Sequence, residues 1–293
     1  MIRLRSDVPA PDFLVSEKIK GVLEEARKAV AEGRKPDLQD HWARDEDTRQ
    51  KQHERHYDGK CCYCERKRDI SLERDVEHYR PKKAVEDVDG HPGYWWLAYE
   101  WGNLLISCKT CNTLHKGNQF PLADEDKRVL EEGDVGDEEP LLINPANEDP
   151  EEYISYQYEK VGGQWIAYPL PRDPTDEVKF RRAAETIRIA GLQRTALMGS
   201  EERSECVPML MKLLKSWKAS QVLLDRAMDR KADLVAEGAD QGAIDQAEEL
   251  IAKTTGSIAQ IECEIRAETR FEKTYAGFRR YLVRKETDGM IAL

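Results

Sequence analysis

Apolar residues recur every three or four positions along two stretches near the end of the chain, residues 207–235 and 244–265. Because an α-helix has about 3.6 residues per turn, this spacing gathers the apolar side chains on one face of each predicted helix. The turn between the stretches, residues 237–242, contains two glycines. The pattern predicts an antiparallel helical hairpin, interrupted at Gln221, that serves either for internal packing or as a docking arm for another subunit.

Further helices are predicted on both sides of a central non-helical region. Residues 16–33 form an amphipathic pattern that begins at Ser16, a residue type that caps helices, and ends at Gly33. A second, very polar helix is predicted from residue 38 to residue 57. From Thr175 onward the pattern is helical throughout.

Short β segments are predicted in the central region. One lies around residues 76–79 and stops at Pro81, whereas residues 103–107 lead into a short helix. Residues 153–158 and 164–168 flank a pair of glycines and predict a hairpin.

The most aromatic stretch of the chain is residues 93–101. It is predicted to pack in the core of a small metal-binding fold, with stacking on nucleic-acid bases as the alternative.

The formal net charge of −11 comes from one part of the chain. Residues 121–152 contain 13 acidic and 2 basic residues, whereas the remainder contains 44 of each. The acidic stretch is predicted to be an exposed linker or flap. The rest of the chain has no net charge, which permits a nucleic-acid partner but would not bind one unaided. Another protein is therefore expected to supply part of the affinity.

The composition also bears on the compartment. No apolar run approaches the length of a bilayer span, and residues 1–5 lack the apolar stretch of a signal peptide, so no membrane association is expected. Four of the seven cysteines lie in metal-type pairs and nothing indicates export. A cytoplasmic location is therefore expected.

Two Cys-x-x-Cys pairs carry the strongest chemical signal. They are Cys61 with Cys64 and Cys108 with Cys111. Four thiolates in two such pairs are the soft ligands that a closed tetrahedral Zn²⁺ site requires. Buried thiols in an ordinary core are the alternative, but they would not explain the two-residue spacing of both pairs.

Glu77 and His78 lie between these pairs, Asn103 precedes the second pair and Asn112 directly follows it. Neighbouring side chains on a strand point to opposite faces, so Glu77 and His78 are expected to do different jobs. A carboxylate that binds a hard cation and an imidazole that takes a proton from water are the parts that phosphodiester hydrolysis needs. Asn112 can offer an amide oxygen to the same cation, and Asn103 can fix a neighbouring loop and with it the orientation of His78.

These residues resemble the motif of the HNH endonucleases, the zinc-stapled form of the ββα-metal nuclease fold. The resembling segments are Cys61-x-x-Cys64, Glu77-His78-Tyr79-Arg80-Pro81, Asn103-Leu104 and Cys108-x-x-Cys111-Asn112. The longer segments that begin at Glu77, Tyr94, Trp101 and His115 are similar to the HNH nuclease subunit of Septu-type and retron-associated anti-phage systems.

The resemblance implies a role for each residue. His78 is similar to the general base, and Glu77 stands where many HNH enzymes have aspartate. Glu77 and Asn112 would bind a catalytic Mg²⁺ or Mn²⁺, with His115 as a candidate third ligand or phosphate contact. Cys62 lies outside the ligand spacing and is expected to be a spectator beside the structural Zn²⁺.

The resemblance also implies partners. The substrate would be DNA or RNA, with phosphate contacts from Arg80, Lys82, Lys109 and Lys116. An ATPase subunit of the same defence system is expected, together with a reverse transcriptase and its msDNA in the retron-associated systems. The nature of the target, duplex DNA, single-stranded DNA or RNA, stays open.

The expected fold class is α+β, a small zinc-stapled ββα-metal core embedded in a mainly α-helical protein with a C-terminal helical hairpin. Four regions are predicted. They are an N-terminal helical region at 1–58, the HNH core with its Cys₄ zinc site at 59–122, the acidic linker or flap at 123–150, and a mainly helical, partner-docking region at 151–293.

Two other functions remain in competition with the effector nuclease. A stand-alone restriction or homing nuclease would use the same chemistry, but the chain has no recognisable sequence-reading domain. A zinc-ribbon scaffold would keep His78 as a structural residue and use the helical region to dock partners. Substitution of His78 separates these alternatives, because a scaffold would retain its function without the imidazole.

Overall fold

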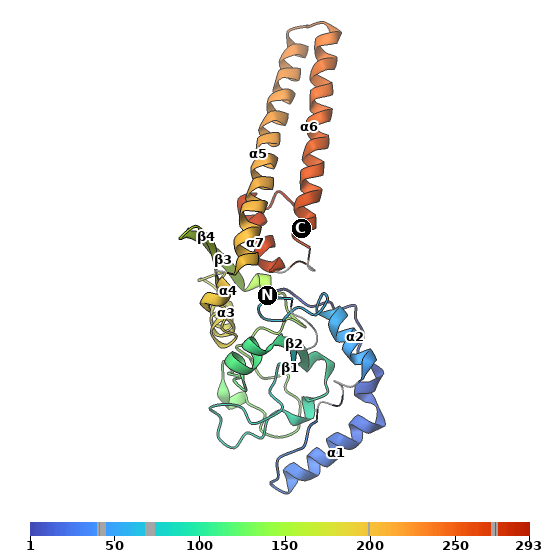
Figure 1. Ribbon diagram of the computed structural model, residues 1–293, viewed down its shortest axis with the longest axis vertical. Helices are drawn as coiled ribbons and strands as arrows, with labels where there is room; N and C mark the ends of the chain where they lie inside the picture. Colours follow the sequence, from blue (N-terminus) through green and yellow to red (C-terminus); the bar gives the residue numbers. More distant parts are fainter. Residues whose placement is uncertain (40, 42–44, 68–73, 199, 271–272, 274) are drawn as a thin grey trace. The chain divides into compact units, whose positions relative to one another are not determined.

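The computed structural model describes residues 1–293 except 40, 42–44, 68–73, 199, 271–272 and 274 (Figure 1). The described chain divides into two compact units, residues 1–159 with 167–199 and residues 160–166 with 200–293. The predicted mixture of helices and small sheets is confirmed. The first unit contains the predicted nuclease region together with the N-terminal helices and the acidic stretch.

The N-terminal helices differ from their predicted bounds. Helix α1 spans Glu17–Ala31, and the hydroxyl of Ser16 donates to the carbonyl oxygen of Phe13 at 2.7 Å instead of capping the helix. Helix α2 spans Glu46–Arg55 and is shorter than predicted, because the carboxylate of Asp45 caps its first turn. Residues 40 and 42–44 of the predicted polar helix lie outside the described residues.

Two antiparallel strands and a short helix form the centre of the first unit. Strand β1 spans Arg74–His78 and pairs with β2, which spans Leu104–Cys108. Glu77 is opposite Leu105 in this ladder, and His78 is opposite Leu104. The chain then enters η5, a π-helical segment at Thr110–Lys116. Such wide turns are often found at functional sites.

The aromatic stretch packs inside the first unit, as predicted. It contains two single-turn helices, η3 at Trp95–Leu97 and η4 at Trp101–Asn103. The buried aromatic residues are Tyr94, Trp95, Trp96 and Tyr99. Core packing, and not base stacking, is therefore the role of these four side chains.

Residues 123–139 are mostly exposed, whereas residues 141–146 are all buried, so the predicted exposed flap at 123–150 does not extend over its whole length. Two charged residues of the exposed part, Arg128 and Glu138, are buried and tie it to the core. The carboxylate of Glu138 pairs with Arg80 and accepts a hydrogen bond from the hydroxyl of Tyr94 at 2.9 Å. Arg128 donates to the same hydroxyl at 2.8 Å. Because buried charges are costly unless they are paired, these contacts hold the stretch against the aromatic core.

A β-hairpin and two helices complete the first unit. Strands β3 at Ile154–Val161 and β4 at Gln164–Pro171 form the predicted hairpin, whose tip belongs to the second unit. Helix α3 spans Glu177–Ile189 and begins at a side-chain cap from Asp176. Helix α4 follows at Thr195–Met198.

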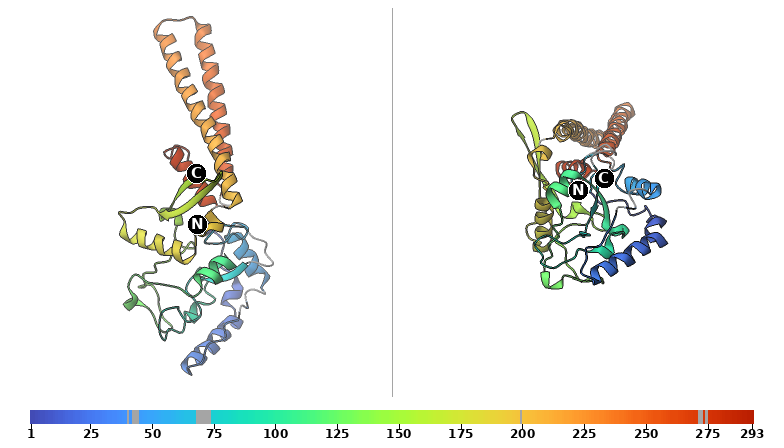
Figure 2. Two further views of the ribbon diagram at one scale, coloured as in Figure 1. Left: turned by 60° about the vertical axis from the view of Figure 1, so that its left-hand side comes forward. Right: turned by 60° about the horizontal axis from the view of Figure 1, so that its bottom comes forward.

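The second unit contains the predicted helical hairpin. Helix α5 spans Glu201–Ala236 and helix α6 spans Gln241–Glu268, and the two run side by side in Figures 1 and 2. Helix α7, Ala276–Glu286, packs against α5. None of the helices in the described part of the chain has the length and apolar character that crossing a bilayer requires.

The buried stripe of α5 shifts from its predicted position after the break at Gln221. The spacing predicts Met228 and Val235 on the buried face, but they are 54% and 57% exposed. Ala227 and Leu234, one residue earlier in each case, are buried in their place. Neighbouring residues on a helix are about 100° apart around its axis, so this shift turns the predicted pair toward solvent.

Candidate functional site

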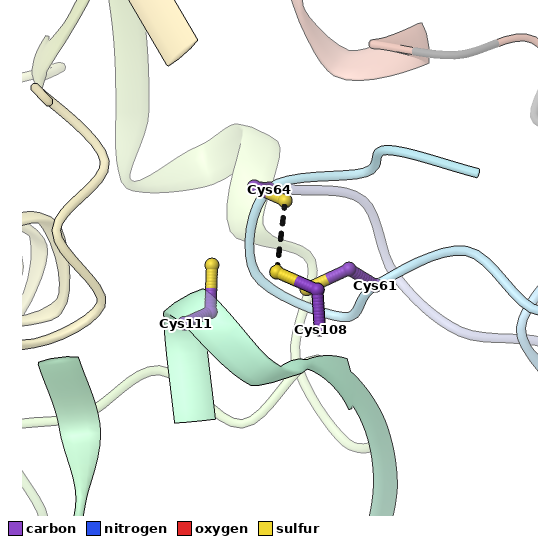
Figure 3. A group of neighbouring side chains, drawn as sticks. All are labelled: Cys61, Cys64, Cys108 and Cys111. Carbon is purple, nitrogen blue, oxygen red and sulfur yellow. Dashed lines mark hydrogen bonds between the residues drawn. The ribbon is translucent and has the colours of Figure 1, made fainter. Parts of the chain in front are cut away.

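Four cysteine side chains from both predicted pairs come together (Figure 3). The sulfur atoms of Cys61, Cys64, Cys108 and Cys111 lie within 4.8 Å of one another, and all four residues are buried. The Cys64 and Cys108 sulfurs are 3.8 Å apart. With Zn–S bonds of about 2.3 Å, a tetrahedral site needs sulfurs about 3.8 Å apart, so the cluster fits a structural zinc ion.

Cys62 does not share this environment, although it is adjacent to Cys61. Burial is the main influence that raises the pKa of its thiol well above the ordinary value. Its backbone N–H donates to the carbonyl oxygen of Ile106 at 2.9 Å. A neutral buried thiol behaves as a small apolar side chain, which agrees with the predicted spectator role.

An arginine far away in the sequence contacts the cysteine cluster. The Nη2 of Arg194 donates to the sulfur of Cys111 at 3.4 Å, and Nη1 donates to the carbonyl oxygen of Gly191 at 2.8 Å. Burial lowers the pKa of Arg194, but the negative thiolates of Cys111 and Cys64 outweigh it and the pKa is raised. The arginine therefore offsets part of the charge that four thiolates would give a zinc site.

We expect Arg194→Gln to weaken zinc retention while leaving the four ligands in place. Loss of an outer contact to a metal ligand typically costs about 10- to 100-fold in metal affinity. The measurement is the rate of zinc transfer to a competing chelator. Arg181→Gln, which replaces an exposed arginine on α3, is the matched control. Equal transfer rates in the two variants would contradict a role for Arg194 at the metal centre.

His78 lies at the end of β1 and is 9% exposed. Its Nε2 is 3.0 Å from the carbonyl oxygen of Ala98. Because a carbonyl oxygen only accepts hydrogen bonds, Nε2 carries the hydrogen of the neutral ring. In the neutral ring, Nδ1 is then the nitrogen without a hydrogen.

Asn103 ties together the two backbone segments that surround His78. Its Oδ1 accepts from the backbone N–H of Arg80 at 2.7 Å. Its Nδ2 donates to the carbonyl oxygens of Arg80 at 3.1 Å and Leu97 at 2.9 Å. Leu97 directly precedes Ala98, the residue that contacts the His78 ring. The side chain of Asn103 thus connects the end of β1 to the segment that orients the imidazole.

Glu77 points to different neighbours from those of His78, as alternation along a strand requires. Its carboxylate accepts from the Nζ of Lys116 at 2.6 Å and from the hydroxyl of Tyr63 at 3.2 Å. All three side chains are buried. Burial is the largest influence on the Glu77 carboxyl and raises its pKa above the ordinary value, against the opposing effect of Lys116.

Asn112 and His115 are both on η5. The Nδ2 of Asn112 donates to the carbonyl oxygen of Val76 at 3.2 Å, which places the amide beside the strand that carries Glu77. The ring of His115 lies against Gly191, where a β-carbon would come within 2.5 Å of its Nδ1. Burial, followed by the charge of Arg194, lowers the pKa of His115.

The predicted ligands of a hard divalent cation are Glu77 and Asn112. The carboxylate of Glu77 and the amide of Asn112 are oxygen donors, and a cation, the ammonium of Lys116, already lies against the carboxylate. In the described part of the chain, no Cys, His, Asp or Glu side chains besides the four cysteines form a group of three close enough to share an ion. Magnesium sites commonly use one or two carboxylates and take further ligands from substrate phosphates.

The four basic residues assigned to nucleic-acid contact lie in different environments. Arg80 and Lys116 are buried, and their charges pair with Glu138 and Glu77. The Nζ of Lys82 donates to the carbonyl oxygen of Leu38 at 3.0 Å. Lys109, between the second pair of cysteines, is exposed.

Comparison with known proteins gives one informative similarity. Septu protein PtuB of Bacillus mycoides (strain KBAB4) is 45% identical to this chain over 105 residues. The match covers 34% of this chain and 36% of the relative, so the chain spans about a third of the length of the protein it matches. No family model matches the chain, and no solved structure matches it.

Proposed function

We propose that this chain is a metal-dependent endonuclease of the HNH type that hydrolyses phosphodiester bonds in DNA or RNA. The observation that carries the proposal is the contact network of Asn103, which joins the end of β1 to the segment that orients His78. The carboxylate of Glu77 on the opposite side of the strand adds the second group that the reaction requires.

His78 is the proposed general base. Its Nδ1 accepts a proton from the attacking water, and the hydrogen bond from Nε2 to Ala98 stabilises the imidazolium that forms. Asn103 is a positioning residue, since it acts through the backbone around His78. Glu77 and Asn112 would hold the divalent cation, with His115 as the candidate third ligand on η5. When bound, this ion stabilises the negative charge of the pentacovalent transition state and of the leaving oxygen.

The proposed phosphate contacts centre on Lys109 and Lys82. Lys109 is exposed at the start of η5, and Lys82 follows the strand that carries His78. Arg80 could join them only by leaving Glu138. Because the acidic stretch accounts for the net negative charge, the remaining neutral surface binds a phosphate backbone weakly, and a partner is proposed to add affinity.

The proposed biological role is that of an effector in a Septu-type anti-phage system. The similarity to Septu protein PtuB supports this role over a third of the chain. An ATPase subunit is the proposed partner, and the hairpin α5–α6 is the proposed docking arm. In a retron-associated system, a reverse transcriptase and its msDNA would join the complex.

We expect Asn112→Ala to lower cleavage in a way that the divalent cation can partly reverse. Loss of an amide ligand weakens cation binding but leaves the base and the zinc cluster intact. Cleavage should therefore recover in part at high Mg²⁺ or in Mn²⁺, and chelation by EDTA should abolish it in every variant. Rates are measured against cation concentration, with Asn118→Ala as the control. An Asn112→Ala enzyme with the parental cation dependence would contradict the assignment of this ligand.

The proposed function itself is tested by copurifying the chain with its proposed ATPase partner. Cleavage of duplex DNA, single-stranded DNA and total RNA is then measured with and without Mg²⁺. The proposal predicts Mg²⁺-dependent cutting of at least one of these substrates. An intact, zinc-loaded complex that cuts none of them would contradict it.

A further inference from the structure

Lys116 holds a position that its sequence pattern does not indicate. The residue is 1% exposed, and its ammonium contacts the Oε1 of Glu77 at 2.6 Å. The same ammonium donates to the backbone carbonyl oxygen of His78 at 3.1 Å. A single cation therefore contacts both residues to which the proposed reaction assigns chemistry, from the last turn of η5.

The charges of Glu77 and Lys116 cancel each other in the protein without a bound divalent cation. The carboxylate of Glu77 contributes one negative charge and the ammonium of Lys116 one positive charge. The other side-chain contact of the Glu77 carboxylate, the hydroxyl of Tyr63, is neutral. The cysteine cluster carries the same charge whichever residue replaces Lys116. A divalent cation approaching Glu77 thus meets a carboxylate whose charge is already balanced at hydrogen-bonding distance.

We propose that Lys116 is a positioning residue that makes loading of the catalytic cation depend on bound nucleic acid. The inference rests on the proposed nuclease function and adds a regulation of the same site. With Lys116 in place, the free protein binds the divalent cation weakly. A substrate phosphate beside Glu77 supplies the missing negative charge, and the cation then binds between the phosphate, Glu77 and Asn112.

This arrangement has a functional consequence. A nuclease that binds its divalent cation only together with the substrate has no metal-loaded active site while no nucleic acid is bound. It also explains why a buried lysine, which is costly to desolvate, contacts the proposed metal ligand directly. A purely structural ion pair would have the same contacts but would not change cation affinity when nucleic acid binds.

The test is a Mn²⁺ binding measurement on zinc-loaded protein, with free Mn²⁺ counted by its paramagnetic resonance signal. The variants are Lys116→Gln, which removes the charge but keeps a hydrogen-bond donor, and Lys116→Arg, which keeps the charge. Without nucleic acid, we expect Lys116→Gln to bind Mn²⁺ about tenfold or more tightly than the parent, because a unit charge a few ångströms from the ion is gone. Lys116→Arg should bind as weakly as the parent. Equal affinity in Lys116→Gln and the parent would overturn the proposal.

A second measurement uses the chain with native Lys116, so it does not depend on how the variants fold. Mn²⁺ affinity is compared with and without a short DNA duplex or RNA hairpin, in a His78→Ala background that prevents cleavage. We expect about tenfold tighter binding with at least one of these nucleic acids, because its phosphate restores the missing charge. Affinity that is equally tight without nucleic acid would overturn the proposal. If cleavage by the parent still depends on His78 and Mg²⁺, only this inference fails and the proposed nuclease function stands.

Discussion

Cys64→Ser is expected to leave a chain that neither holds zinc nor folds stably. In small zinc modules the metal contributes on the order of 10 kcal/mol to folding, more than the net stability of most domains. The four buried cysteines join the loop at residues 61–64 to the end of β2 and the start of η5. Without one ligand, these segments lose their main connection. We expect substoichiometric zinc and rapid proteolysis, measured by metal analysis and limited digestion.

Cys62→Ser is the matched control for this prediction. Cys62 is as deeply buried as the ligands, so its replacement removes a sulfur atom from the same region while all four ligands stay in place. We expect full zinc occupancy and near-parental protease resistance. A Cys64→Ser protein with one bound zinc per chain would show that the cluster is not a four-cysteine metal site.

His78→Ala is expected to lower cleavage by about 100-fold or more, the usual contribution of a positioned general base. The variant removes the Nδ1 that takes the proton from water and the Nε2 contact to Ala98. It touches neither the cysteine cluster nor the ammonium pair at Glu77. The measurement is the cleavage rate of the purified complex at saturating Mg²⁺.

Further measurements on the same variant separate the loss of a base from a loss of structure. Zinc content and partner binding should match those of the parent, and His53→Ala on α2 should cut normally. Mn²⁺ should not restore the activity of His78→Ala, in contrast to that of Asn112→Ala. A His78→Ala variant that recovers fully in Mn²⁺ would assign His78 to the metal and not to the proton transfer.

The cysteine cluster and the separation of Glu77 from His78 could be predicted, because each depends on residues only a few positions apart in the sequence. Two residues between paired cysteines suit one metal ion, and the structure gathers all four sulfurs. The alternation of a strand separates Glu77 from His78, and their different contacts follow from it. The loop-fixing role predicted for Asn103 agrees with its contacts to Arg80 and Leu97.

The parts that depend on tertiary contact could not be predicted in this way. Arg194 reaches Cys111 across 83 positions of sequence, and no local pattern links the two. The sequence predicts Lys116 as a phosphate contact, because lysine side chains are usually exposed and nothing in the neighbouring residues indicates that this one is buried. In α5, the spacing of apolar residues predicts that Met228 is buried. The structure buries Ala227 instead, on the helix that packs against α6.

The central claim, that His78 acts as the general base of a metal-dependent nuclease, is tested most directly by chemical rescue. His78→Gly leaves a space beside the carbonyl of Ala98, into which added imidazole can bind as a replacement base. The account predicts that the zinc-loaded His78→Gly complex is nearly inactive in Mg²⁺ and that cleavage rises with imidazole concentration until it saturates. A His78→Gly complex that cuts nucleic acid at the parental rate without imidazole would contradict the account and favour a zinc-ribbon scaffold.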